Sequence, residues 1–147
     1  MDKINVTKEL NAVLKEERRA EQSYEKFISE ADDEKIKNVF LQIRKNHLEH
    51  ADLLAERIRS LGAVPDRGTG MAGIFSNMKL DMGTNGKNSV DILKIAYDEE
   101  DKGIAAVEKV IRERLDDISA GLVKDILSND HGHLKSMLTL MSDIELQ

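Results

Sequence analysis

The sequence predicts an all-α protein folded as an antiparallel four-helix bundle, and three observations support this fold class. The 147-residue chain contains a single proline, and no stretch shows the alternation of apolar and polar residues that is typical of strands. Four long segments instead repeat apolar residues at the three- and four-residue spacing of a helix. Helices with one apolar stripe each bury these stripes by packing side by side, with short turns between antiparallel neighbours.

The first two segments form the first predicted hairpin, residues 5–61. One helix is expected roughly from Val6 to Ala31 and the next from about Asp33 to Leu61. Gly62 follows, and glycine commonly occupies the position after a last helical turn because it tolerates positive φ. Helices of about 25 to 28 residues are roughly 40 Å long, which suits a bundle.

The last two segments form the second predicted hairpin, residues 89–145. Its first helix begins near Ser89, whose hydroxyl is suited to cap a helix N-terminus. Its second helix follows the pair Asp116 and Asp117. The first hairpin also turns at a pair of aspartates, so the two hairpins share their turn chemistry.

A shift of 83 residues aligns the first hairpin with the second. Leu10 then aligns with Leu93, and Ile43 aligns with Ile126. This period is too long for a solenoid repeat. We therefore interpret the chain as two related helical hairpins.

A long crossover, residues 62–88, connects the hairpins and is rich in glycine and asparagine. Such connections are unusual within a compact domain and commonly carry structure of their own. Apolar residues recur in it at helical spacing, namely Met71, Ile74, Phe75, Met78 and Met82. They predict a short amphipathic helix that covers the bundle, with a methionine-rich surface for a protein partner as the alternative. The whole chain, residues 1–147, is expected to be a single domain.

Charge and composition argue against several classes of function. The formal net charge is −6 and no long basic run occurs, which argues against nucleic acid as a partner. The absence of cysteine excludes disulfides, thiolate metal sites and cysteine nucleophiles. The polar N-terminus has no apolar signal core, and no segment is apolar enough to span a bilayer. We therefore expect a cytoplasmic protein without membrane contact.

Six polar residues interrupt the apolar stripes at matching places in the two hairpins. His47 and His50 lie on the stripe of the second predicted helix, where an unpaired polar group costs about 1–3 kcal/mol. The 83-residue shift pairs Glu17 with Glu100, His47 with Asp130 and His50 with His133. Each set lies at the same distance from its hairpin turn, so all six should meet at the middle of the bundle.

Three carboxylates and three imidazoles in one dry layer are unstable as free charges. A cation resolves this problem, because carboxylate oxygens and imidazole nitrogens are good ligands for iron, manganese and zinc. Residues three apart on a helix lie about 5–6 Å from each other, close enough to bind one ion together. We therefore predict a site for one or two metal ions, with iron first and manganese or zinc as alternatives. A polar layer without metal is the other interpretation.

Three short segments carry these residues: "EERRAEQSY" contains Glu17 and Tyr24, while "HLEHA" and "DHGHL" contain the histidines. They resemble the ferritin-like superfamily, to which rubrerythrins and bacterioferritins belong, at its first-helix ligand and its Glu-x-x-His motifs. The chain is most similar to a group of small uncharacterised bacterial proteins, a domain of unknown function. In that group a loop like "DRGTGMAGIFSNMKLDMGTNG" precedes a helix with a glutamate-aspartate pair, here Glu100 and Asp101. The resemblance implies a ferritin-like bundle.

The sequence departs from the superfamily pattern at two places. His47 and Asp130 stand where the motifs carry glutamates, so the site would have three carboxylates rather than four. Glu21, one turn further along the first helix, is a candidate for an additional ligand. Glu16 and Glu99 could contribute only if their helices were rotated.

Two tyrosines are expected to support this site. The hydroxyls of Tyr24 and Tyr97 should reach its carboxylates from the core. The charged run "KEERRAE" is otherwise expected to lie at the helix surface, with the exception of Glu17.

The predicted function is metal binding in a ferritin-like bundle. If the protein is an enzyme, which the sequence leaves open, its chemistry would be metal-centred oxidation such as ferroxidase activity or peroxide reduction. The alternative is a non-catalytic structural or interaction protein with a structural or vestigial metal site. No shell-forming interface is evident from one sequence, so association into a homo-oligomer also stays open.

Overall fold

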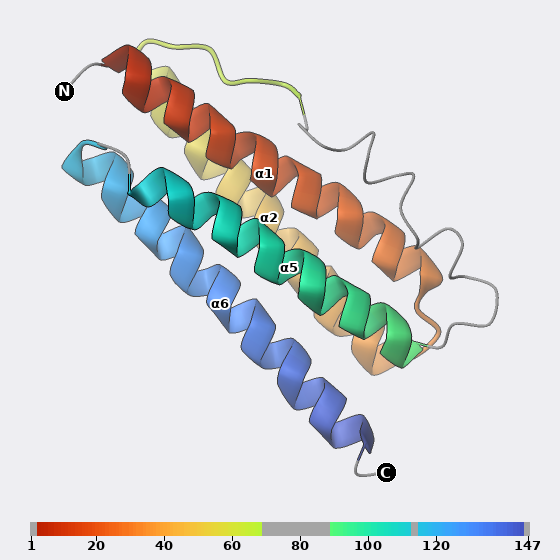
Figure 1. Cartoon of the computed structure of the whole chain (residues 1–147). Coiled ribbons are helices and arrows are strands. Elements are labelled where there is room, and N and C mark those ends of the chain that lie inside the picture. The colour runs from red at the N-terminus through yellow and green to blue at the C-terminus, as the bar shows by residue number, and fades with distance from the viewer. Residues whose placement is uncertain (1–2, 69–88, 113–114, 146–147) are drawn as a thin grey trace.

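The computed structural model describes residues 3–68, 89–112 and 115–145. These residues form the helices α1 (Lys3–Glu30), α2 (Glu34–Ser60), α5 (Ser89–Ile111) and α6 (Asp117–Glu145). Each helix runs opposite to the one before it within its hairpin, and α1 packs against both α2 and α5 (Figure 1). The predicted all-α antiparallel four-helix bundle is confirmed.

The ends of α2 show why the first hairpin turns where it does. The Asp33 carboxylate accepts hydrogen bonds from the backbone N–H groups of Lys35 and Ile36, at 2.8 and 3.1 Å, and so caps the helix. At the other end Gly62 has a φ of +84°, a conformation that glycine adopts without steric cost. The N–H of Ala63 then reaches back to the carbonyl of Ile58, at 3.2 Å, which completes a Schellman motif.

The second hairpin repeats this capping at Asp116. Its carboxylate accepts from the N–H of Ser119 at 3.1 Å, just as Asp33 does in the first hairpin. Ser89 behaves differently from the prediction that it caps its own helix. It is the first residue of α5, and its hydroxyl accepts from the N–H groups of Asp32 and Asp33, at 2.8 and 3.0 Å. This contact fastens the start of α5 to the α1–α2 turn.

Two apolar clusters fill the bundle on either side of a polar layer. The aromatic core lies toward the α1–α2 turn and includes Tyr24, Phe27 and Phe40. The aliphatic core lies toward the α5–α6 turn and consists of valine, leucine, isoleucine and alanine. The polar residues predicted to interrupt the stripes lie between these two cores, at the middle of the helices.

The first part of the crossover runs back along α1. The N–H of Asp66 donates to the side chain of Asn11 at 2.7 Å, and the Asp66 carboxylate lies 3.1 Å from Nζ of Lys15. The predicted short helix with its methionine-rich surface, Met71 to Met82, lies outside the described residues. Within the described helices no segment has the length and hydropathy needed to cross a membrane. That residues 1–147 form one domain stays a prediction.

Candidate metal centre

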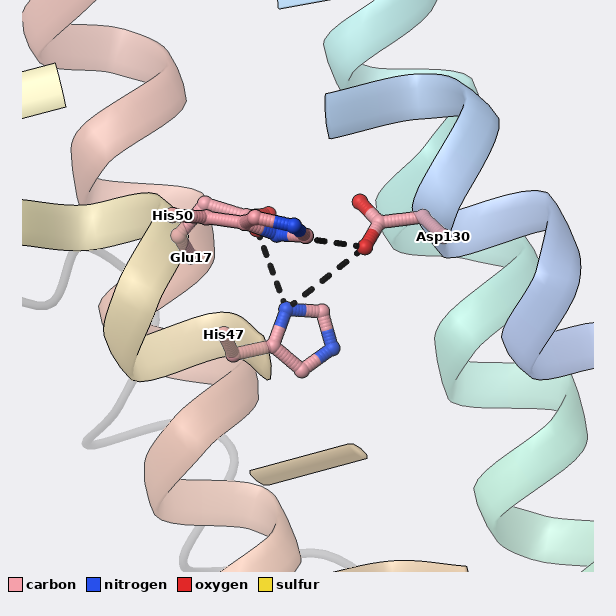
Figure 2. Close-up of side chains that lie close together, drawn as sticks. All are labelled: Glu17, His47, His50 and Asp130. Atoms are coloured by element: carbon pink, nitrogen blue, oxygen red, sulfur yellow. Dashed lines mark hydrogen bonds and ion pairs between the residues drawn. The ribbon is translucent and has the colours of Figure 1, made fainter. Parts of the chain in front are cut away.

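All four helices contribute to the polar layer, and the six predicted residues meet there. Glu17 comes from α1, His47 and His50 from α2, Glu100 from α5, and Asp130 and His133 from α6. Their exposed fractions run from 1% to 7%, so the layer is almost closed to solvent. Figure 2 shows Glu17, His47 and His50 directed at Asp130 from the opposite hairpin. The helix register predicted from the sequence therefore holds in each helix.

Glu17 binds both histidines of its own hairpin. Nδ1 of His47 and Nδ1 of His50 lie 3.0 and 2.6 Å from the same oxygen, Oε1. The imidazoles can donate to it because a carboxylate oxygen has more than one lone pair.

Glu100 holds the equivalent place in the second hairpin and has more partners. Nδ1 of His133 lies 3.0 Å from its Oε2, and Nε2 of His47 lies 3.0 Å from its Oε1. The hydroxyl of Tyr24 donates to Oε1 at 2.7 Å. His47 thus links the first-hairpin glutamate to the second-hairpin glutamate, one through each ring nitrogen.

Asp130 lies at the centre of the layer with an unsatisfied oxygen. Among the described residues, its Oδ1 is buried and has no hydrogen-bond partner. Nδ1 of His50 and Nδ1 of His133 both lie 3.5 Å away, and Nδ1 of His47 lies 3.8 Å away. A buried acceptor without a partner destabilises the folded state, so a cation bound to this oxygen would stabilise the layer most.

The protonation of the layer follows from burial and charge. Burial raises the pKa of Asp130, and the nearby Glu17 carboxylate adds to this effect, bringing the pKa to about 9. For His47, burial favours the neutral ring, but Glu100 and Glu17 outweigh it and hold the pKa well above its usual value. Without a metal, both residues therefore carry a proton at neutral pH.

The two glutamates remain ionised for the opposite reason. Burial acts to raise the pKa of Glu17, but the charge and hydrogen bonds of His47 and His50 leave it below its usual value. Burial is likewise overcome at Glu100, where His47 and His133 lower the pKa. The metal-free layer thus combines two carboxylate anions, a protonated Asp130 and a charged His47.

Two overlapping groups of ligand atoms have the spacing of a metal site. Glu17, His47, His50 and Asp130 form one group, and His47, Glu100, Asp130 and His133 form the other. Within each group the four ligand atoms lie within 4.8 Å of one another. His47 and Asp130 belong to both groups, so these two residues connect the two halves of the site.

Asn46 is a contributor that the sequence analysis missed. Its Nδ2 donates to Nε2 of His133 at 2.8 Å, which leaves Nδ1 of that ring directed at Glu100. Groups that bind the outer nitrogen of a ligand histidine orient the ring. Its position directly before His47 beside the apolar stripe is the only sequence signal, and many surface residues share such a position.

Glu21 does not join the cluster, contrary to the expectation of an additional ligand. Its Oε1 instead accepts from Nε of Arg44 at 2.8 Å. Four residues exceed one helical turn by about 40°, which rotates Glu21 from the bundle centre toward α2. Burial and a hydrogen bond with Glu25 raise the pKa of Glu21 despite the arginine.

The two tyrosines also differ. Tyr24 reaches Glu100 as expected, but Tyr97 is half-buried beside the aromatic core and makes no hydrogen bond to the site's carboxylates among the described residues. Helical side chains lean toward the helix N-terminus. Tyr97 precedes Glu100 and leans away from the layer, whereas Tyr24 follows Glu17 and leans toward it.

Arg19 corrects the prediction that the charged run lies at the surface. The residue is only 8% exposed, and its guanidinium forms a close ion pair with Glu16. Its Nη1 also lies 3.9 Å from Glu99, which is itself 9% exposed. Paired carboxylates allow an arginine to be buried. The three-residue spacing of Glu16 and Arg19 was the available signal.

Solved structures with a similar fold are ferritin-like. One is a two-domain protein from Anabaena variabilis with DJ-1/ThiJ/PfpI-like and ferritin-like domains, with a TM-score of 0.80 and 20% identity over 97% of this chain. This chain spans only 40% of that protein's length. Another is a dodecameric thioferritin, the bacterioferritin-related protein of Bacteroides fragilis, with a TM-score of 0.79 and 20% identity. That match covers 99% of this chain and 89% of the other.

These likenesses establish a ferritin-like bundle, as the sequence predicted. No curated protein matches the chain. Residues 5–113 match the family described as Domain of unknown function (DUF2383), and the chain belongs to this family.

Proposed function

We propose that this protein binds a divalent transition-metal ion in the polar layer, with iron first and manganese or zinc as alternatives. The observation that carries the proposal is the unpartnered Oδ1 of Asp130, which three imidazole nitrogens approach within 3.5 to 3.8 Å. A cation beside this oxygen would give the unpaired buried acceptor a metal–ligand bond. The proposed ligands are Glu17, His47, His50, Glu100, Asp130 and His133.

The donor set fits such an ion. Imidazole nitrogen together with carboxylate oxygen suits iron, manganese and zinc, and the chain has no cysteine to favour softer metals. We expect one tightly bound ion, because the two ligand groups share His47 and Asp130. A second ion would need these shared residues to serve both positions, and a neutral imidazole offers one nitrogen to one ion and cannot bridge two. It should be labile or absent.

Protons held by the layer should set the pH dependence of binding. His47 and Asp130 are both protonated at neutral pH, since the pKa of His47 is raised and that of Asp130 is about 9. A cation must displace these protons. Apparent affinity should therefore rise with pH and level off only above about 9. An affinity that is constant between pH 6 and 8 would contradict these protonation states.

We further propose metal-centred oxidation, either ferroxidase activity or peroxide reduction. Iron, when bound, would supply electrons to dioxygen or peroxide. The ionised Glu17 and Glu100 would stabilise the higher charge of the oxidised ion. Tyr24 would hold Glu100 in place through its hydroxyl, and the apolar cores on either side would exclude bulk water.

A non-catalytic bundle with a structural metal site is the second candidate. The observation in its favour is that the layer joins all four helices, through the contacts of His47 with both glutamates and of Asn46 with His133. Oxygen consumption after addition of Fe(II) separates the two candidates. Turnover supports the oxidative function, and stable binding without turnover supports the structural one.

Metal content and melting temperature test the proposed site itself. Elemental analysis of the purified protein should find metal, and chelation at pH 7 should lower its melting temperature. An ion present at a hundredfold excess over Kd stabilises the folded state by about 2.7 kcal/mol. The effect should be much smaller near pH 5, where protons compete for the ligands. Identical melting curves with and without chelator at pH 7, for protein shown to contain metal, would contradict the proposal.

Self-association is proposed as well, since the similar Bacteroides fragilis protein is described as dodecameric. Light scattering of the purified chain would test it. The expected cytoplasmic location stays a prediction.

A further inference from the structure

A small cavity adjoins the polar layer on the side where α1 packs against α5. Its volume is about 10 Å³, which is room for about one water-sized particle. Its inner wall includes Glu17, His47, Glu100 and Asp130. Its outer wall includes the half-buried Gly103 and Glu16. The cavity therefore joins the cluster to a less buried part of the α1–α5 face.

Gly103 keeps this side open because it has no side chain. A Cβ at this position would lie 3.1 Å from Oε1 of Glu16 and 3.6 Å from Nη2 of Arg19. Glycine within a helix is less favourable than alanine. The glycines of α6, Gly121 and Gly132, differ in that an added Cβ would meet nothing within 4 Å. Among the glycines of the described helices, only Gly103 thus stands where a side chain would obstruct the cavity.

Charged side chains line much of the cavity. Glu16 and Glu99 directly precede the cluster residues Glu17 and Glu100 in the sequence, so carboxylates continue from the cavity wall to the buried layer. Arg19 lies among them, paired with Glu16 and with its Nη1 3.9 Å from Glu99. The guanidinium thus lines the cavity beside the two carboxylates.

Two other sides of the layer are covered by polar contacts. Between α1 and α2, Arg44 spans Glu21 and Glu25 at 2.8 and 2.9 Å. Between α2 and α6, Asn46 lies against His133 at 2.8 Å. The α1–α5 side instead has a cavity that reaches from the cluster to the half-buried Gly103, so the packing provides an entrance there.

We propose that divalent cations enter and leave the buried site through this α1–α5 passage, past Gly103, with Arg19 as its closing side chain. The proposal rests on the proposed metal site. Glu16 and Glu99 would attract the cation, and displacement of the Arg19 guanidinium would open the way to Glu17 and Glu100.

The test is the rate of Co²⁺ binding to Gly103→Leu, measured by stopped-flow visible absorption. The leucine should obstruct the passage without touching a proposed ligand. We expect the rate of Co²⁺ association to fall by about tenfold or more, because the leucine raises the barrier to entry. A barrier affects both directions equally, so release to a chelator should slow by the same factor while Kd stays unchanged. Damage to a ligand would instead change Kd.

Gly121→Leu is the matched control, because the same side chain at that exposed position should leave both rates unchanged. Circular dichroism checks that each variant is folded. If Gly103→Leu does not fold, Gly103→Ala provides the same comparison against Gly121→Ala, with a smaller slowing. Arg19→Met should have the opposite effect and speed association.

The outcomes separate the passage from the site. Wild-type protein that binds no Co²⁺ would overturn the proposed site and this passage with it. If wild-type protein binds Co²⁺ and folded Gly103→Leu binds it equally fast, the passage alone is overturned. Slowed association with slowed release and constant Kd would support the passage.

Discussion

The two hairpins place the same kinds of residues at the same heights but give them different chemistry. Leu10 and Leu93 are both fully buried, and Glu17 and Glu100 are 1% and 5% exposed. The capping residues of α2 and α6 also accept hydrogen bonds in the same way. At the centre, however, His47 faces Asp130. The scaffold is thus nearly symmetric, and the charge within it is not.

This asymmetry decides how the layer exists without metal. His47 donates to both glutamates, while Asp130 holds a proton and has an oxygen without a hydrogen-bond partner. The first hairpin therefore supplies a cation and the second supplies a neutral acid. Glutamates at both position 47 and position 130 would give the layer four carboxylates and one imidazole fewer to pair with them.

The hairpins also differ beside the layer. Tyr24, Phe27 and Phe40 fill the aromatic core, whereas the corresponding residues of the second hairpin are Val107, Val110 and Val123. Tyr24 contacts the rings of Phe27 and Phe40, with centroids 5.2 and 5.7 Å away. Among the described residues, it is consequently the first hairpin that supplies a hydroxyl to the layer, and the contact crosses to Glu100 of the second hairpin.

The largest expected effect tests the difference between the two cores. Phe40→Ala should lower the free energy of unfolding by about 3–5 kcal/mol, because it removes a fully buried ring from a packed cluster. Val123→Ala, at the equivalent position, should cost only about 2 kcal/mol. Urea unfolding of the metal-free proteins measures both. Equal losses would show that the two cores are energetically equivalent.

The next effect tests the equivalence of the two glutamates. Glu17→Ala and Glu100→Ala should each weaken metal binding by about a hundredfold, or roughly 2.7 kcal/mol. Isothermal titration provides the measurement, and Glu9→Ala, which is remote from the layer, is the control. If Glu100→Ala retained full affinity while Glu99→Ala lost it, the assignment of the α5 ligand would be wrong.

A smaller effect should follow from restoring the symmetry at the centre. His47→Glu gives both hairpins a carboxylate at this position, and each can bridge two ions. We expect affinity for a second ion to rise by about tenfold, a gain of roughly 1.4 kcal/mol. If iron is the native metal, its oxidation should also speed up. Two equally tight ions in the wild type would mean that the histidine imposes no deficit.

The smallest effect concerns the contact between the hairpins at Tyr24. Tyr24→Phe removes the hydroxyl that donates to Glu100 at 2.7 Å, but two imidazoles still bind that carboxylate. We expect a loss of about 0.5–1.5 kcal/mol in unfolding free energy. Tyr97→Phe is the matched control and should stay within about 0.5 kcal/mol of wild type. Equal losses from the two substitutions would argue against a specific role for Tyr24.

The sequence by itself determined the four helices and the common height of the six polar residues. Helical periodicity is a local property, so the apolar stripes could be interpreted without knowledge of the fold. The matched spacing in the two hairpins then placed Glu17, Glu100 and the histidine pairs at mid-bundle. This part of the site depends only on distance along a helix from a turn.

The tertiary structure decided which groups touch within that layer. The rotation of each helix and the lean of its side chains directed Tyr24 to the site while Tyr97 leans away, and paired Glu21 with Arg44. Burial by neighbouring helices decided that Asp130 keeps its proton and that Arg19 lies inside. These properties depend on contacts between helices far apart in the sequence, and spacing along one helix does not contain them.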